Sequence, residues 1–71
     1  MYKDAIMDEL RQIELEVVEG EKRLAEYEAL LVEMKRSNED TSRVEAELEA
    51  LRENQSDRER SRQRLLSLLH P

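Results

Sequence analysis

The apolar residues in the first half of this chain recur at the alternating intervals of a coiled-coil helix. From Ile6 to Met34 the intervals are 4, 3, 4, 3, 4, 3, 4 and 3 residues, with Gly20 the one position without a side chain. Such spacing collects the apolar side chains into one stripe along a helix, which is the heptad pattern. The sequence therefore predicts a long amphipathic helix over about residues 4–36.

The heptad pattern stops at residues 37–42, which include no apolar side chain. Residues of this kind form turns and cap helices. Asn38 can adopt the left-handed backbone conformation that ends a helix. One of residues 40–42 can cap the next helix, and Ser42 and Glu45 have the spacing of a capping box. We therefore expect the first helix to end here.

A second apolar stripe runs from Val44 to Leu69 in a shifted register. Met34 and Val44 are ten residues apart, a distance that one uninterrupted heptad register does not accommodate. We predict a turn at residues 37–41 and a second helix over about residues 42–69. Two helices of similar length with a short connection form an antiparallel hairpin. A continuous coiled coil with a local change of register is the alternative, and it predicts a much longer rod.

Folding the chain at this turn brings apolar residues of the two stripes together, for example Leu31 and Leu48. The middle of the second helix is different, because residues 52–64 include no apolar side chain. Gly20 is expected to face Arg58, where the missing side chain leaves room for the aliphatic stem of the arginine.

We predict that one apolar seam joins the two helices and forms the core of the hairpin. It consists of Leu10, Ile13, Val17, Leu24, Tyr27, Leu31, Met34, Val44, Leu48, Leu51, Leu65 and Leu69. A ribbon of small and aliphatic residues lies on nearly the opposite side of the first helix, and we interpret it as a second contact surface. This ribbon consists of Leu15, Val18, Ala25, Ala29 and Val32.

A lone hairpin of 71 residues cannot cover both sides of its apolar surface. We therefore predict an all-α, coiled-coil-like hairpin over residues 1–71 that forms a homodimer or a higher homo-oligomer, with a four-helix bundle as the expected assembly. The corresponding function is helix-mediated protein–protein association. An alternative is a small subunit that folds onto a different protein, resembling the hairpin co-chaperones of bacterial secretion systems.

Composition gives no indication of catalysis, metal binding or a cofactor. The chain has no Cys, and its one His, His70, lacks the Glu-x-x-His pattern of di-iron bundles. A Gly-rich phosphate loop and a three-member catalytic set are also missing. We expect a non-enzymatic protein without metal or cofactor.

We also expect no membrane association and a cytoplasmic location. The longest apolar run, Ala29–Val32, is too short to cross a bilayer, and the first ten residues do not have the pattern of a signal peptide. With a net charge of −6, the chain is not suited to bind nucleic acid by general electrostatic attraction.

The arginines of the second helix are the one feature that suggests nucleic-acid binding. They lie at positions 58, 60, 62 and 64, alternate with Glu59, Ser61 and Gln63, and lack aromatic neighbours for base stacking. We interpret them as a solvated face that is partly paired with acidic residues 16–21 of the first helix. An Arg-mediated nucleic-acid binder remains a further alternative.

Residues 18–69 resemble a group of short, uncharacterised bacterial helical-hairpin proteins. The resemblance depends on Glu19-Gly20-Glu21-x-Arg23, on Leu30-Leu31 and Asp40-Thr41, and on the closing Arg62-x-Arg64-Leu65-Leu66. Proteins of the group usually have Gly shortly before the Asp-Thr pair, where this chain has Asn38. The resemblance implies a hairpin in a bacterial cytoplasm and no particular activity.

Overall fold

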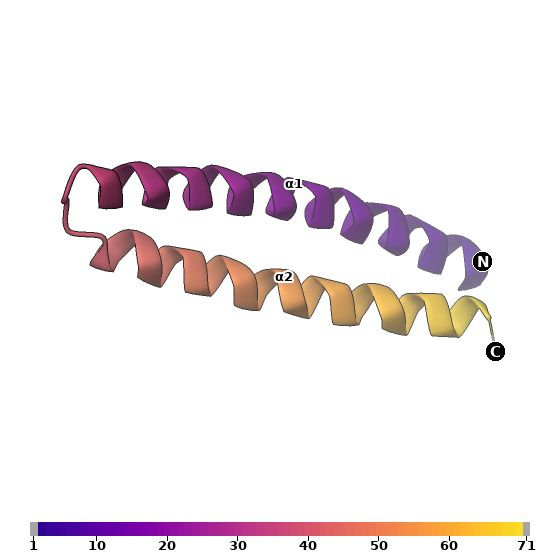
Figure 1. Cartoon of the computed structure of the whole chain (residues 1–71). Helices are drawn as coiled ribbons and strands as arrows, with labels where there is room; N and C mark the ends of the chain where they lie inside the picture. The colour runs from indigo at the N-terminus through magenta and orange to yellow at the C-terminus, as the bar shows by residue number, and fades with distance from the viewer. Residues whose placement is uncertain (1, 71) are drawn as a thin grey trace.

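A computed structural model shows two antiparallel α-helices joined by a short turn (Figure 1). It describes residues 2–70, so both ends of the predicted 1–71 unit lie outside the described residues. Helix α1 runs over Tyr2–Arg36 and helix α2 over Ser42–Leu69, with no strand in the described part of the chain. The helices pack side by side in a body of 54 × 14 × 14 Å. The predicted all-α hairpin is confirmed, and the continuous rod is wrong.

Helix α1 ends in a Schellman motif centred on Asn38. The Asn38 N–H donates to the Lys35 carbonyl at 3.2 Å, and the Glu39 N–H donates to the Met34 carbonyl at 2.9 Å. Asn38 has a φ of 58°, a left-handed conformation that Gly adopts most readily and Asn tolerates. The predicted left-handed end of the first helix is confirmed, and it turns the chain back toward α1.

Helix α2 begins at a carboxylate of one of the three predicted capping residues, Asp40, but without the predicted capping box. The Asp40 Oδ1 accepts hydrogen bonds from the Ser42 N–H at 3.0 Å and from the Ser42 hydroxyl at 2.8 Å. Thr41, at the N-cap, makes no side-chain cap hydrogen bond. The Glu45 carboxylate lies 4.0 Å from the Lys35 Nζ. The predicted capping box of Ser42 and Glu45 is wrong, because the Ser42 hydroxyl donates to Asp40 and Glu45 lies beside Lys35 of α1.

The core is a single line of apolar contacts between the helices. Its buried members are Ile6, Leu10 and Val17 of α1 and Leu48 of α2. The other predicted seam residues are half-buried: Ile13, Leu24, Tyr27, Leu31, Met34, Val44, Leu51, Leu65 and Leu69. Every predicted seam position thus loses exposure to water, but two helices cover each other along one line only. Much of the seam therefore stays accessible from the faces of the hairpin.

Candidate interaction surfaces

A buried polar contact lies at the middle of the apolar seam. The Gln55 side chain is 8% exposed, and its Nε2 donates to the Val17 carbonyl oxygen across the helix interface at 2.7 Å. Its Oε1 accepts a hydrogen bond from Arg58 Nη1 at 3.2 Å. The amide is thereby satisfied at both ends, as a buried polar group must be.

Gly20 provides the space for this contact. A Cβ atom placed on Gly20 would be 2.8 Å from Gln55 Cδ and 2.9 Å from Arg58 Nη1. The prediction that Gly20 faces Arg58 is therefore incomplete. Gln55 and Arg58 both border the space beside the glycine, where Arg58 Nη1 donates a hydrogen bond to Gln55 Oε1. The sequence signal for this role was available, because Gln55 occupies a seam position of the heptad pattern.

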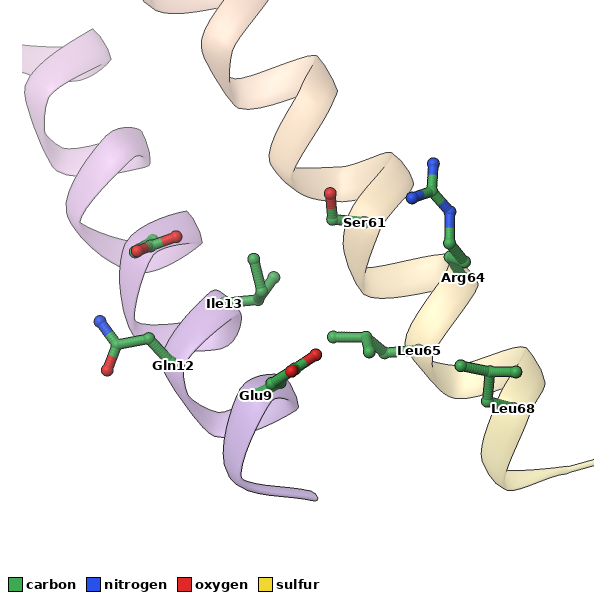
Figure 2. A pocket seen from close by; sticks show the side chains of 8 residues that line it. Glu9, Gln12, Ile13, Ser61, Arg64, Leu65 and Leu68 are labelled. Carbon is green, nitrogen blue, oxygen red and sulfur yellow. The ribbon is translucent and has the colours of Figure 1, made fainter. Parts of the chain in front are cut away.

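An apolar groove lies between the helices near the open end of the hairpin (Figure 2). Its volume is about 470 Å³. Ile13 of α1 and Leu65 of α2 point toward each other across it. The full lining consists of Glu9, Gln12, Ile13, Glu16, Ser61, Arg64, Leu65 and Leu68. The groove thus has an apolar floor of seam residues and a polar rim, which is the usual arrangement of a protein-binding surface.

Leu68 is the apolar lining residue that the sequence analysis did not include in the seam. It is 46% exposed and lies one position before the seam residue Leu69. Successive residues of a helix are rotated by about 100° about its axis. The side chain of Leu68 therefore lies beside the line of contact, on the face of the hairpin that carries the groove.

The same face is also hollowed nearer the turn, around Tyr27 and Leu51. Tyr27 lies two heptads beyond Ile13 along α1, so both belong to one side of the helix. A hydrogen bond with the Glu47 carboxylate, together with the negative charge of that group, raises the pKa of the Tyr27 hydroxyl above its usual value. This face therefore carries half-buried apolar groups along most of the hairpin.

The predicted second ribbon lies on the outer side of α1. All five of its residues are exposed, with Leu15 at 64%, Val18 at 60% and Val32 at 55%. They lie away from the line of contact with α2, although Leu15 and Val18 also border hollows that α2 residues line on the two faces of the hairpin. The structure thus places the ribbon and the seam on different sides of α1, as expected from their spacing.

The arginine cluster is largely engaged within α2. Arg60 Nη1 lies 3.4 Å from Asp57 Oδ1, and Arg62 Nη1 lies 3.9 Å from Glu59 Oε2. The expectation that these arginines pair with acidic residues 16–21 of α1 is not met. Residues three apart on a helix are close neighbours, so local partners compete effectively with those on α1. The ion pairs between the helices lie nearer the turn and include Arg52 with Glu28.

None of the helices in the described range has the length and apolar character needed to cross a bilayer. Within residues 2–70, no three His, Asp or Glu side chains are grouped in a way that could hold a metal ion. Comparison with protein-family models, curated proteins and solved structures finds no match.

Proposed function

We propose that this chain acts by helix-mediated self-association, and that two hairpins join through the groove face into a four-helix bundle. The observation that carries this proposal is the incomplete burial of the apolar groove residues. Ile13 and Leu65 are half-buried, and Leu68 is more exposed than either. These side chains lose only part of their hydration within one hairpin, and the remaining burial requires a second surface.

The accessible area of the hairpin supports this proposal. The chain exposes 5643 Å², whereas a compact monomer of 8.5 kDa is expected to expose roughly 4,700 Å². The excess of about 900 Å² is comparable to the ~800 Å² that each partner contributes to a stable interface. A second hairpin on the groove face would remove area of this size, and the charged rim would remain in water.

Protein–protein association without catalysis is the function that follows. A bundle of this kind would serve as a small structural or adaptor protein in the bacterial cytoplasm. The charged outer side of α2 would remain exposed, because it includes Glu49, Glu53 and Arg60.

Sedimentation equilibrium of the full chain over a range of concentrations, with far-ultraviolet circular dichroism of the same samples, tests the proposal. We expect a highly helical dimer. Leu68→Glu places a charge in the groove and should weaken dimerisation by at least about tenfold, because burying an unpaired charge is costly. Ser67→Glu adds the same charge at an exposed position outside the groove and should leave the dimer unchanged.

Three results would contradict the proposal. A helical monomer at every concentration would show that one hairpin is stable alone. A poorly helical monomer would instead favour a chain that folds onto a different protein. Equal effects of Leu68→Glu and Ser67→Glu would show that the groove face is not the dimer interface.

A further inference from the structure

The exposed ribbon of α1 is part of a second, complete heptad seam. Once Lys22 is included, Leu15, Val18, Lys22, Ala25, Ala29 and Val32 follow one another at intervals of 3, 4, 3, 4 and 3 residues. We call this set the outer seam. A heptad stripe is the pattern by which one helix packs along another; here Lys22 is its one charged position, and α2 already covers the opposite side of α1. The outer seam therefore has the form of a docking surface for another helix.

Two acidic columns border the outer seam, one on each side. Heptad positions place Glu19, Glu26 and Glu33 along one edge and Glu14, Glu21 and Glu28 along the other. Among the described residues, Glu28 pairs with Arg52 and Glu33 pairs with Arg36, whereas the other four carboxylates form no ion pair. A helix that docks here thus meets an apolar line between two rows of negative charge.

These columns disfavour a second copy of this chain on the outer seam. In an antiparallel α1 pair, flanking residues of the same column meet, so Glu19 would face Glu26 of the other copy and Glu21 would face Glu28. In a parallel pair, Glu14 would face Glu19 of the other copy. Like charges at these positions are repulsive, so two outer seams repel each other in both directions.

Helix α2 of a second copy does not fit this surface either. Its solvent-facing side begins with the small residue Ala46 and continues with Glu49, Glu53, Ser56 and Arg60. This side lacks the apolar stripe that would pack along the outer seam. An anionic membrane surface is also disfavoured, because amphipathic helices that bind such membranes have basic rather than acidic borders.

We propose that the outer seam binds an amphipathic helix of a different protein, with an apolar stripe bordered on both sides by Lys or Arg. Basic borders would neutralise the two acidic columns and give the partner both orientation and selectivity. The outer seam spans about 26 Å of helix, so the partner helix is at least about 18 residues long.

Lys22 adds a further requirement to the partner. It occupies a central position of the outer seam and forms no ion pair with the residues that the structure describes. A charged residue at one core position of a coiled coil fixes the register of the two helices. We expect the partner to place a Glu or Asp opposite Lys22, where the two charges would compensate each other.

Three labelled synthetic helices of 21 residues provide the probes, and fluorescence anisotropy with the full chain at physiological salt provides the readout. The first peptide has Leu and Ala in its stripe, Lys along both borders and one central Glu. The second has Glu along both borders, and the third has Lys borders but Gln in place of the stripe. We expect the first peptide to bind at least about tenfold more tightly than the other two.

Variants of the chain locate the binding. Replacing Val18 and Val32 together by Ser should weaken binding of the first peptide by about tenfold or more, because both exposed side chains supply apolar contact area. Leu68→Ser, in the groove on the other side of α1, should leave this binding unchanged. Lys22→Glu should weaken it, and a peptide with Lys in place of its central Glu should restore it.

Several results would overturn this inference. Equal affinity for the first and third peptides would show that general electrostatic attraction, without the apolar stripe, accounts for the binding. An unchanged affinity in the Val18/Val32 variant would place binding elsewhere. Loss of the homodimer in that variant would assign the outer seam to a second copy. If the chain bound vesicles of phosphatidylcholine and phosphatidylglycerol but not the first peptide, the outer seam would be a lipid-binding surface. Self-association through the groove face is measured separately by sedimentation, so either proposal can fail without the other.

Discussion

The side chain of Gln55 donates a hydrogen bond to the backbone carbonyl of Val17 on the other helix, at a distance of 2.7 Å. A helical carbonyl retains a second lone pair beside its bond within the helix, but the side chain three residues later usually shields it. That residue is Gly20, which leaves the Val17 oxygen open. Gln55 and Gly20 therefore form one structural unit that fixes the register between the helices, because a slip along the seam would bury the amide without a partner.

Gly20→Ala should have different effects on stability in two backgrounds. In the otherwise unchanged chain, the new Cβ would collide with the Gln55 amide and disrupt its hydrogen bond, so we expect no gain in stability or a net loss of about 1 kcal/mol. In a Gln55→Ala background the amide is absent, and the remaining close atom, Arg58 Nη1, ends a flexible side chain that can move aside. The same substitution should then stabilise the chain by about 1 kcal/mol through its better helix propensity.

A double-mutant cycle measured by urea unfolding tests this interpretation at fixed protein concentration. A coupling energy of more than about 1 kcal/mol between positions 20 and 55 is expected, because the two residues are in direct contact. Independent, additive effects would show that Gly20 and Gln55 do not act as a unit.

Leu48→Ala should be among the most destabilising single truncations in the chain. Leu48 is 2% exposed, so its removal leaves a cavity as well as lost burial, at a cost of about 2–5 kcal/mol. Leu31→Ala, at a half-buried seam position, should cost less, and Leu15→Ala, on the exposed outer seam, should cost little. Thermal and urea unfolding of the three variants would give this order, and equal losses for Leu48→Ala and Leu15→Ala would contradict the position of the core.

The hairpin could be predicted from the sequence because its determinants are local or periodic. The interval between Met34 and Val44 breaks the heptad register, and Asn38 marks the point at which α1 ends. These signals depend on backbone geometry and repeat only with the helix period. For the same reason the side of α1 that carries Val18 could be distinguished from the side that carries Val17.

The contacts at the centre of the hairpin and at the start of α2 could not be predicted in the same way. Periodicity places Gln55 and Arg58 on the seam, but it does not show that both border the space beside Gly20 or that Gln55 reaches the Val17 carbonyl, because both side chains are long and flexible. The prediction of a capping box between Ser42 and Glu45 failed for a related reason. Asp40 and Glu45 both offer carboxylates near the first turn of α2, and the choice depends on the path of the turn and on the position of Lys35.

Substitutions at Asn38 should report on the end of α1. Asn38 has a φ of 58°. For most residues with a Cβ this conformation has an energy cost of about 1–2 kcal/mol; the cost is smaller for Asn, and Gly has no comparable cost. Asn38→Gly should therefore raise stability modestly, and Asn38→Ala should lower it by about 1 kcal/mol. Ser37→Ala, at the preceding exposed position, is the control for the loss of a polar side chain. If Asn38→Gly and Asn38→Ala had the same unfolding midpoint, the left-handed conformation would not contribute to stability.

The start of α2 should make stability depend on pH through Asp40. Hydrogen bonds from the Ser42 backbone N–H and from its hydroxyl hold the pKa of the Asp40 carboxyl below its ordinary value of 3.8. A group whose pKa is lower in the folded state than in the unfolded state stabilises the fold above the unfolded pKa, and this contribution disappears as the pH falls through the folded pKa.

Asp40→Asn keeps an oxygen that can accept hydrogen bonds but removes the charge. We therefore expect wild type to unfold at a higher temperature than this variant at about pH 7, and this difference to shrink as the pH falls below 3.8 and through the lowered pKa of Asp40. Circular dichroism melts across this range provide the measurement. Glu39→Gln is the matched control, because the neighbouring Glu39 side chain forms no hydrogen bond with the described residues. If the difference in unfolding temperature between wild type and Asp40→Asn stayed constant over the whole pH range, the charge of Asp40 would not stabilise the start of α2.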